Sequence, residues 1–285
     1  MGRSIQHIGV IGAGLMGNGI AQVSAQAGLA VTMIDVADAA VHKGLAAITG
    51  SLDRLVKKDQ LTAADKDATL SRIAGSSDYT ALADADLVIE AATENPVIKL
   101  NILRQAEGIV RPDAIIATNT SSISITQLAA VLKAPERFIG VHFFNPVPMM
   151  ALVELIRGLQ TSDKTHARCL EFTQAIGKRP ITVKNAPGFV VNRILCPMIN
   201  EAIFTLQEGL ASAEDIDTGM QLGCKHPIGP LALADLIGLD TLMAIMNVFC
   251  EGYNDPKYRA APLLKEMVAA GWLGRKSGRG FYRYD

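Results

Sequence analysis

The chain has 285 residues, of which 49% are hydrophobic and 19% charged, with a formal net charge of -1. This composition is typical of a folded globular protein and excludes a disordered chain. The balanced charge gives no reason to expect nucleic acid or an anionic membrane as a partner. No apolar run in the sequence approaches the roughly 20 residues that a membrane span requires.

The N-terminus and the cysteines indicate the compartment. The first residues lead directly into an apolar run, which predicts that no signal peptide is present. The cysteines are widely spaced and form no C-x-x-C pair, so we expect neither a zinc site nor a disulfide framework; they are Cys169, Cys196, Cys224 and Cys250. Both observations favour the cytoplasm, and no metal site is expected.

A glycine-rich stretch near the N-terminus predicts a dinucleotide site. Residues 8–11 form a short apolar run, and Gly12, Gly14 and Gly17 follow in G-x-G-x-x-G spacing before a helical pattern. In such a turn the first glycine permits the tight bend, the second lets a pyrophosphate approach the backbone, and the third lets helix and strand pack closely. The helix N-terminus then attracts the diphosphate.

An acidic residue completes this fingerprint. Residues 30–34 are typical of the next strand, and Asp35 follows them. A carboxylate about 20 residues beyond the glycines holds the adenosine ribose hydroxyls and repels a 2′-phosphate. The sequence therefore favours NAD over NADP.

The rest of the first half alternates between helix and strand patterns. Residues 40–74 are helical in character and are expected to project from the sheet edge as an arm. Strands are then predicted at the apolar runs 86–92, 114–118, 138–144, 152–156 and 180–183. This alternation predicts an α/β Rossmann-type domain over residues 1–186, with a doubly wound, mostly parallel sheet. Ligands in such sheets bind beyond the carboxyl ends of the strands.

The second half, residues 187–285, is predicted to be an all-α domain. Helical patterns cover residues 190–208, 213–222, 231–249 and 262–270. Ser212 is expected to cap the second of these helices. Helices this apolar need partners on more than one side, so we expect the domain to pack on the first domain and on a second copy of itself.

His142 is the first candidate for proton transfer. It ends the predicted strand 138–144, and Glu154 lies on the next strand. A carboxylate beside a histidine fixes its tautomer and stabilises the imidazolium that forms when the ring takes a proton. The alternative is a hydrogen-bonded core or loop histidine. The position of His142 at a strand end of a cofactor-binding fold favours the catalytic interpretation.

Three further polar residues are candidates for the ligand site. Asn119 and Ser121 end the strand 114–118, although asparagine and serine also favour turns for local reasons. Asn192 lies in the opening turn of an otherwise apolar helix. A buried amide there needs a hydrogen-bond partner, and a substrate oxygen could supply it.

Seven short motifs occur in one order along the chain. They are residues 12–17 (GAGLMG), 119–122 (NTSS), 142–146 (HFFNP), 152–154 (LVE), 187–193 (PGFVVNR), 226–231 (HPIGPL) and 271–278 (GWLGRKSG). Together they resemble the L-3-hydroxyacyl-CoA dehydrogenase family, and most closely its bacterial 3-hydroxybutyryl-CoA dehydrogenase branch. The resemblance covers essentially the whole chain.

The resemblance implies an oxidoreductase that interconverts (S)-3-hydroxyacyl-CoA and 3-oxoacyl-CoA in fatty acid metabolism. It implies that His142 is the general acid/base, that Glu154 orients it, and that Ser121 and Asn192 bind the reacting end of the substrate. The cofactor is NAD, and the residues implied in binding it are Gly12, Gly14, Leu15, Met16, Gly17, Asp35, Glu94, Lys99, Asn119, Ser121 and Asn145.

The arm and the second domain also acquire roles through the resemblance. Arg54, Lys57 and Lys58 correspond to the place where the family receives the CoA nucleotide, whose phosphates need positive charge. A solvated helix face is the alternative for these three cations. The family dimerises through its helical domain, which agrees with the apolar surface expected above.

Three alternative functions stay open from the sequence. The substrate could be a short-chain acyl-CoA such as 3-hydroxybutyryl-CoA, or a dicarboxylic one such as 3-hydroxyadipyl-CoA. A related dehydrogenase of a free hydroxy acid or sugar acid would not need the basic arm. A non-enzymatic dinucleotide-binding protein would have no reason to combine Ser121, His142, Glu154 and Asn192.

Overall fold

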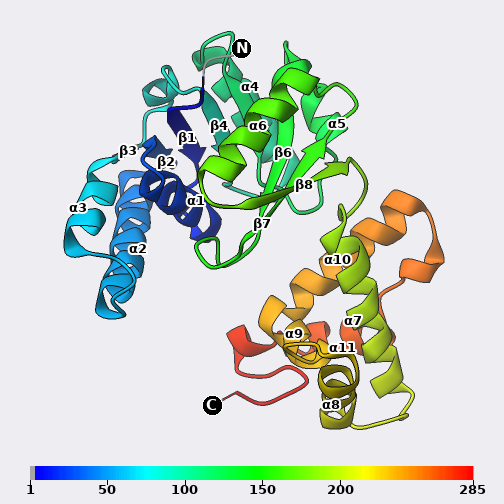
Figure 1. Cartoon of the computed structure of the whole chain (residues 1–285). Helices are drawn as coiled ribbons and strands as arrows, with labels where there is room; N and C mark the ends of the chain where they lie inside the picture. Colours follow the sequence, from blue (N-terminus) through cyan, green and yellow to red (C-terminus); the bar gives the residue numbers. More distant parts are fainter. Residues whose placement is uncertain (1–3, 285) are drawn as a thin grey trace. The chain divides into compact units, whose positions relative to one another are not determined.

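The computed structural model describes residues 4–284, and the chain divides into two compact units, residues 1–185 and 186–285. Figure 1 shows the first unit in blue to green and the second in yellow-green to red. The sequence places the division after residue 186, within the same linker.

The first unit is built on an eight-stranded sheet with the order β3-β2-β1-β4-β5-β6-β7-β8. Every neighbouring pair is parallel except β6 and β7, which are antiparallel. The strands are β1 (His7–Ile11), β2 (Ala30–Ile34), β3 (Ile73–Ser76), β4 (Leu87–Glu90), β5 (Ile115–Thr118), β6 (Phe138–Phe143), β7 (Leu152–Arg157) and β8 (Arg179–Lys184). The predicted Rossmann-type, mostly parallel sheet is confirmed.

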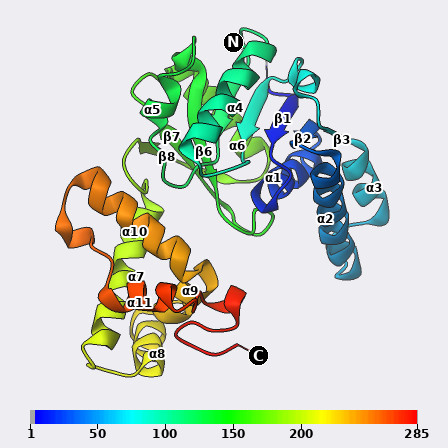
Figure 2. The ribbon, with the colours of Figure 1, turned by 180° about the vertical axis from the view of Figure 1, so that it is seen from behind.

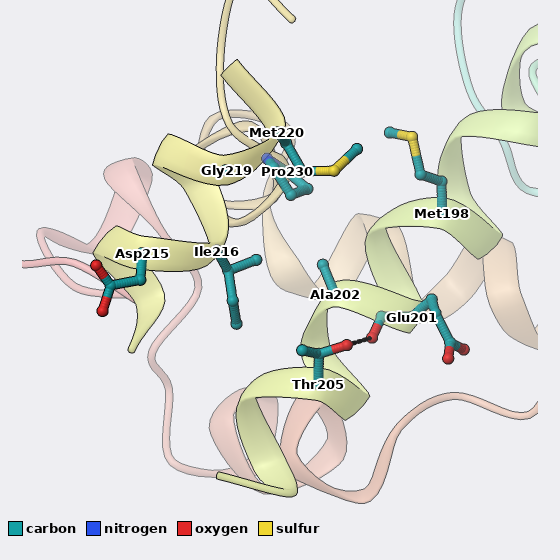
Figure 3. Close-up of a pocket in the computed structure, with 9 residues that line it drawn as sticks. All are labelled: Met198, Glu201, Ala202, Thr205, Asp215, Ile216, Gly219, Met220 and Pro230. Atoms are coloured by element: carbon teal, nitrogen blue, oxygen red, sulfur yellow. Dashed lines mark hydrogen bonds between the residues drawn. The ribbon is translucent and has the colours of Figure 1, made fainter. Parts of the chain in front are cut away.

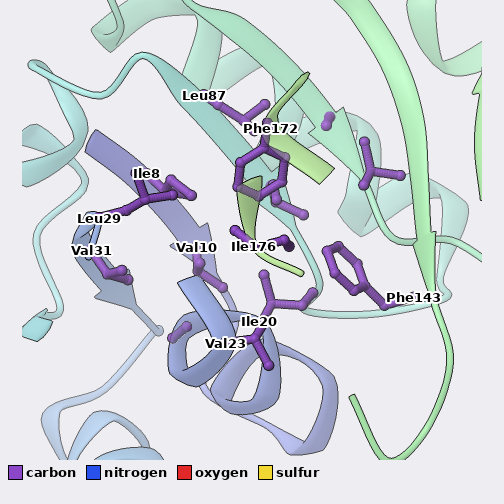
Figure 4. Close-up of a cluster of buried hydrophobic side chains, with 14 of the residues drawn as sticks. Ile8, Val10, Ile20, Val23, Leu29, Val31, Leu87, Phe143, Phe172 and Ile176 are labelled. Atoms are coloured by element: carbon purple, nitrogen blue, oxygen red, sulfur yellow. The ribbon is translucent and has the colours of Figure 1, made fainter. Parts of the chain in front are cut away.

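Side chains alternate between the two faces of the sheet along each strand, and those on one face form a large hydrophobic core. Ile8 and Val10 of β1 point to the same side as Leu87 of β4, where they meet α1 (Leu15–Gln26) and α6 (Asp163–Ala175). Figure 4 shows Ile20 of α1 and Phe172 of α6 packed into this cluster. Strands that are buried on both faces require such a layer of helices on each side.

The opposite face of the sheet receives the polar residues that matter for function. Glu90, Thr118, His142 and Glu154 alternate with members of the large core along β4 to β7, and the apolar Val88 and Ile116 share their face. Here α4 (Pro96–Ile109) contacts β4 and β5, and α5 (Ile125–Ala129) contacts β6 and β7. The sequence predicted neither α5 nor β3, because both are too short to show a clear period.

The arm predicted over residues 40–74 consists of α2 (Asp38–Lys57) and α3 (Ala63–Ser71), which lie side by side. Figures 1 and 2 show the two helices extending together away from the β3 edge of the sheet. One face of α2 is anchored along most of its length, because Val41, Ile48 and Leu52 are buried.

The second unit contains α7 (Val191–Gln207), α8 (Ala213–Cys224), α9 (Pro230–Ile237), α10 (Leu239–Tyr253) and α11 (Pro262–Ala269). Ser212 caps α8 as predicted, because its side chain accepts a hydrogen bond from the backbone N–H of Asp215. The single helix predicted over residues 231–249 is wrong. Gly238 adopts a φ of 99°, a conformation that suits glycine alone, and the chain turns by 97° between α9 and α10.

The second unit also carries an apolar cavity of about 450 Å³ between α7 and α8. Figure 3 shows Met198 and Ala202 of α7 on one side and Ile216 and Met220 of α8 on the other. Among residues 4–284, no single helix is long and apolar enough to cross a membrane, and only the sharply bent pair α9 and α10 reaches that length and composition together.

Candidate active site

The glycine-rich turn joins β1 to α1 at the carboxyl edge of the sheet. Gly12 has a φ of 105°, and a Cβ atom there would lie 2.7 Å from the Cα atom of Ala92. A Cβ atom at Gly17 would lie only 1.7 Å from the carbonyl oxygen of Gly12. A side chain would therefore disrupt the turn at either position.

The turn leaves room for a phosphate group at the start of α1. Gly14 is the N-cap residue, and no side chain of the described residues caps the helix there. A Cβ atom at Gly14 would meet no other described atom within 4 Å. Leu15 is exposed and Met16 partly buried at the same end of the helix. Uncapped N–H groups facing open space fit the diphosphate of a dinucleotide.

Asp35 follows β2 and is tied to this turn. One carboxylate oxygen accepts a hydrogen bond from the backbone N–H of Ala13 at 2.7 Å, and the other accepts one from Val36 at 2.7 Å. These bonds fix the carboxylate beside the glycine turn. Because a carboxylate offers about four lone-pair positions, Asp35 retains capacity for the two ribose hydroxyls of NAD.

His142 and Glu154 form a buried pair across β6 and β7. The two residues are direct partners in the antiparallel register, and the Nδ1 atom of His142 lies 2.7 Å from the Oε2 atom of Glu154. His142 is 4% exposed and Glu154 is completely buried. The ring of Phe144 packs against the imidazole at a centroid distance of 4.6 Å. This arrangement can hold the histidine in one tautomer, as the sequence predicts.

The ends of β4, β5 and β6 are linked by side chains from the loops that follow them. Glu94 accepts hydrogen bonds from the backbone N–H of Ser121 at 2.6 Å and from the hydroxyl group of Thr120 at 2.8 Å. Asn119 accepts one from the backbone N–H of Phe143 at 2.8 Å. Candidate residues from three strand ends are thus fixed relative to one another.

Lys99 lies beneath the loop that follows β4 and carries Glu94, rather than at the surface of the site. Its side chain is 1% exposed, and its ammonium group donates hydrogen bonds to Glu90 and to Thr118. Sequence reasoning missed Glu90 and Thr118. The available signal was a charged residue, Glu90, inside the otherwise apolar run 87–92.

Asn145 is exposed and lies in the turn between β6 and β7. That turn is held by Lys178, whose ammonium group donates hydrogen bonds to the carbonyl oxygens of Val147 at 2.6 Å and Met150 at 2.9 Å. Burial lowers the pKa of Lys178. A Cβ atom at Gly19 of α1 would lie 2.8 Å from Val147, so the turn between β6 and β7 packs closely on α1.

Two groups of predicted residues belong to other elements of the chain. Arg54, Lys57 and Lys58 are exposed at the end of α2 in the arm. Asn192 belongs to the second unit, in the first turn of α7. Between residues 4 and 284, no group of three or more histidine, cysteine, aspartate or glutamate side chains could hold a metal ion.

Sequence comparison decides the family. Residues 7–186 match the NAD binding domain of 3-hydroxyacyl-CoA dehydrogenase, and residues 188–284 match its C-terminal domain. The chain belongs to the 3-hydroxyacyl-CoA dehydrogenase family. The resemblance seen in the sequence is therefore confirmed, and so are the expectations of an NAD-dependent enzyme.

Individual relatives agree over the full length of the chain. A 3-hydroxybutyryl-CoA dehydrogenase from Bradyrhizobium diazoefficiens is 53% identical over 284 residues, which cover 100% of this chain and 97% of that protein. The crystal structure of (S)-3-hydroxybutyryl-CoA dehydrogenase from Ralstonia eutropha is similar with a TM-score of 0.97 and 64% identity, covering 99% of this chain and 100% of that one. A probable 3-hydroxybutyryl-CoA dehydrogenase from Deinococcus radiodurans is 52% identical over 276 residues, which cover 97% of this chain and 99% of that protein.

Proposed function

We propose that this dehydrogenase interconverts short-chain (S)-3-hydroxyacyl-CoA and 3-oxoacyl-CoA, with 3-hydroxybutyryl-CoA and acetoacetyl-CoA as its main pair. The observation that carries the proposal is the buried His142–Glu154 pair near the carboxyl end of β6, in the same sheet as the glycine turn. The names of the relatives in Bradyrhizobium and Ralstonia support the short acyl chain.

His142 acts as the general acid/base in this proposal. With the Nδ1 proton held by Glu154, the lone pair of a neutral imidazole is on Nε2. In the oxidative direction Nε2 takes the proton of the 3-hydroxyl group while the C3–H bond breaks, and C3 becomes a carbonyl carbon. The negative charge of Glu154 stabilises the imidazolium that results. Bound NAD supplies the acceptor for the hydride that leaves C3.

The remaining candidates bind and align the reactants. Ser121 and Asn192 donate hydrogen bonds to the substrate oxygen, because hydride transfer requires closely aligned partners. Asn119 and Asn145 contribute to the nicotinamide side and Glu94 to the nicotinamide ribose, while Lys99, which the sequence also assigned to this ribose, is buried and supports the loop of Glu94 from below. The bonds from Ser121 and Thr120 to Glu94 support this grouping. Gly12, Gly14, Leu15, Met16, Gly17 and Asp35 hold the adenosine diphosphate half.

The arm is proposed to bind the nucleotide part of CoA. Arg54, Lys57 and Lys58 are exposed at one end of α2, and the neighbouring Lys66 is instead engaged with Asp53 at 2.5 Å. Three exposed cations within five positions suit the 3′-phosphate and diphosphate of CoA.

We propose a homodimer built through the second unit, working in the cytoplasm in fatty acid metabolism. The apolar cavity between α7 and α8, with Leu222 of α8 79% exposed nearby in sequence, supports an interface at this face. All four cysteines are free thiols, which agrees with a reducing compartment. Light scattering on the purified chain tests the oligomeric state, and a monomer would contradict the proposed dimer.

The function is tested by following NADH oxidation at 340 nm with acetoacetyl-CoA. Free acetoacetate, a dicarboxylic 3-oxoacyl-CoA and NADPH serve as comparisons. We expect turnover with acetoacetyl-CoA and NADH, and kcat/KM at least tenfold lower in each comparison. Faster turnover of the dicarboxylic thioester would replace the short-chain substrate, and turnover of free acetoacetate alone would overturn the role of CoA.

A further inference from the structure

Glu90 is a fully buried carboxylate that no step of the reaction uses. It is the last residue of β4 and has 0% exposure. One oxygen accepts hydrogen bonds from the backbone N–H groups of Ala92 at 2.9 Å and Thr93 at 3.4 Å. The other accepts from the hydroxyl group of Thr118 at 2.7 Å and from the ammonium group of Lys99. A buried charge with this many donors is a fixed structural centre.

The loop that Glu90 holds connects the glycine turn with Glu94 and Ser121. Its first residues pack on the glycine turn, since a Cβ atom at Gly12 would lie 2.8 Å from the carbonyl group of Ala91. Its next part carries Glu94, which accepts a hydrogen bond from the backbone N–H of Ser121. A shift of this loop therefore moves Glu94 and Ser121 together.

Lys99 connects the cluster to α4. Its side chain is 1% exposed and bonds to Glu90 and Thr118, which belong to the neighbouring strands β4 and β5. Removing one partner of a buried ion pair leaves the other charge without compensation, whereas removing both is far better tolerated. Glu90 and Lys99 are thus expected to act as a unit.

We propose that the buried cluster of Glu90, Lys99 and Thr118 positions the loop of residues 91–95 for the nicotinamide half of the cofactor. Glu90 and Lys99 are positioning residues, and Lys99 acts on the cofactor through Glu90 and this loop rather than by touching it. The inference rests on the proposed function only in assigning Glu94 and Ser121 to the nicotinamide side.

The same strand offers a matched control at its other end. Asp86 directly precedes β4, is 1% exposed, and accepts hydrogen bonds from the backbone N–H groups of Gln6 and His7 and from Arg111 at 2.6 Å. Burial works to raise the pKa of Asp86, but these donors outweigh it and the pKa is lowered. Asp86 and Glu90 are therefore similar carboxylates, one at the amino end of the strand and one at its carboxyl end.

The experiment measures dissociation constants of the whole protein for NADH and for ADP, with no acyl-CoA present. ADP carries only the adenosine diphosphate half of the cofactor. We expect Glu90→Gln and Lys99→Met each to weaken NADH binding about tenfold, the loss typical of a charge-assisted hydrogen bond. ADP binding should weaken by no more than about threefold, because only the start of the loop touches the glycine turn. Asp86→Asn should lower the thermal stability without changing either constant.

The double variant Glu90→Gln/Lys99→Met tests whether the pair acts as a unit. Its NADH affinity should be no lower than that of the single variant that binds NADH more weakly, because the effects of substitutions at two coupled residues do not add. If Glu90→Gln alone does not fold, the double variant replaces it in the measurements of NADH and ADP binding. NADH affinity within about twofold of the parent, equal weakening of ADP binding, or an equal effect of Asp86→Asn on NADH would overturn the proposal. Since no thioester is used, these results stand apart from the test of acetoacetyl-CoA turnover.

Discussion

The Nδ1 atom of His142 lies 2.7 Å from the Oε2 atom of Glu154, and the two residues are direct partners in the only antiparallel pairing among the described strands of the sheet. Directly opposed residues on one face of a ladder have closely spaced Cβ atoms. The reversal of chain direction at the turn 144–151 therefore brings a residue near the end of one strand against one near the start of the next.

Replacing His142 tests the proton-transfer role. His142→Asn should reduce kcat for acetoacetyl-CoA reduction by about 10²–10⁴-fold, the range attributed to a general acid/base. The NADH dissociation constant should stay within about twofold of the parent, since the imidazole is not proposed to hold the cofactor. Steady-state kinetics and fluorescence titration measure the two quantities. A variant with parental kcat would remove His142 from the mechanism.

Replacing Glu154 tests the orienting role separately. Glu154→Gln keeps the shape and removes the charge beside Nδ1, so kcat should fall, but by less than in His142→Asn, and the pH dependence of kcat should change. The KM for acetoacetyl-CoA should change little, because the carboxylate is completely buried. Rates measured between pH 5 and pH 9 decide this, and a profile that superimposes on that of the parent contradicts the role.

Asp35 is expected to determine the choice between NADH and NADPH. Its carboxylate is fixed beside the glycine turn by the N–H groups of Ala13 and Val36. Asp35→Ser should lower kcat/KM for NADH at least about tenfold and should raise it for NADPH, because the repulsion of the 2′-phosphate is removed. Parallel assays at 340 nm give the ratio. An unchanged preference would mean that another residue excludes the 2′-phosphate.

The sequence predicted those parts of the fold that depend on the spacing of apolar residues and glycines within short segments. The apolar runs gave the positions of most strands, and the glycine spacing with Asp35 gave the dinucleotide turn, because both are properties of short segments. The pairing of His142 with Glu154 could also be predicted, since adjacent strands joined by a short turn become neighbours.

Features that depend on distant contacts were not predictable in this way. Glu90 looks like an isolated charge in an apolar run until α4 brings Lys99 against it. The break at Gly238 is hidden because the residues on both sides are apolar and helical in pattern. A single glycine is tolerated inside many helices, so its presence alone did not indicate a sharp turn.

Removing the charges of the arm should weaken CoA-ester binding specifically. In Arg54→Gln/Lys57→Gln/Lys58→Gln the KM for acetoacetyl-CoA should rise about tenfold or more, and kcat should change little, because the three cations lie away from the reacting carbon. The KM should also depend less steeply on salt concentration than in the parent. Lys164→Gln, an exposed charge on α6, is the matched control. Equal KM values in all three proteins would assign the arm cations to a solvated surface.

Tyr284 near the C-terminus gives the chain a predictable alkaline dependence of stability. Its hydroxyl group donates a hydrogen bond to the Oδ2 atom of Asp235 at 2.9 Å. Burial and the neighbouring carboxylate of Asp235 raise the pKa of Tyr284 to about 12. Asp235 also accepts hydrogen bonds from the backbone N–H groups of Phe281 and Tyr282. Tyr284 is therefore one of several residues that bind the C-terminal segment to α9.

The sign of the effect follows from the two protonation equilibria. In the unfolded chain Tyr284 ionises near pH 10, whereas in the folded chain it stays protonated until about pH 12. Its contribution is therefore complete below pH 10 and is lost as the pH rises towards 12. At pH 8 the parent should exceed Tyr284→Phe by about 1 kcal/mol in free energy of unfolding, the usual worth of one hydrogen bond. This difference should be unchanged in urea titrations at pH 9 and should shrink at pH 10 and pH 11. A constant difference from pH 8 to pH 11 would show that the hydrogen bond to Asp235 does not control the ionisation of Tyr284.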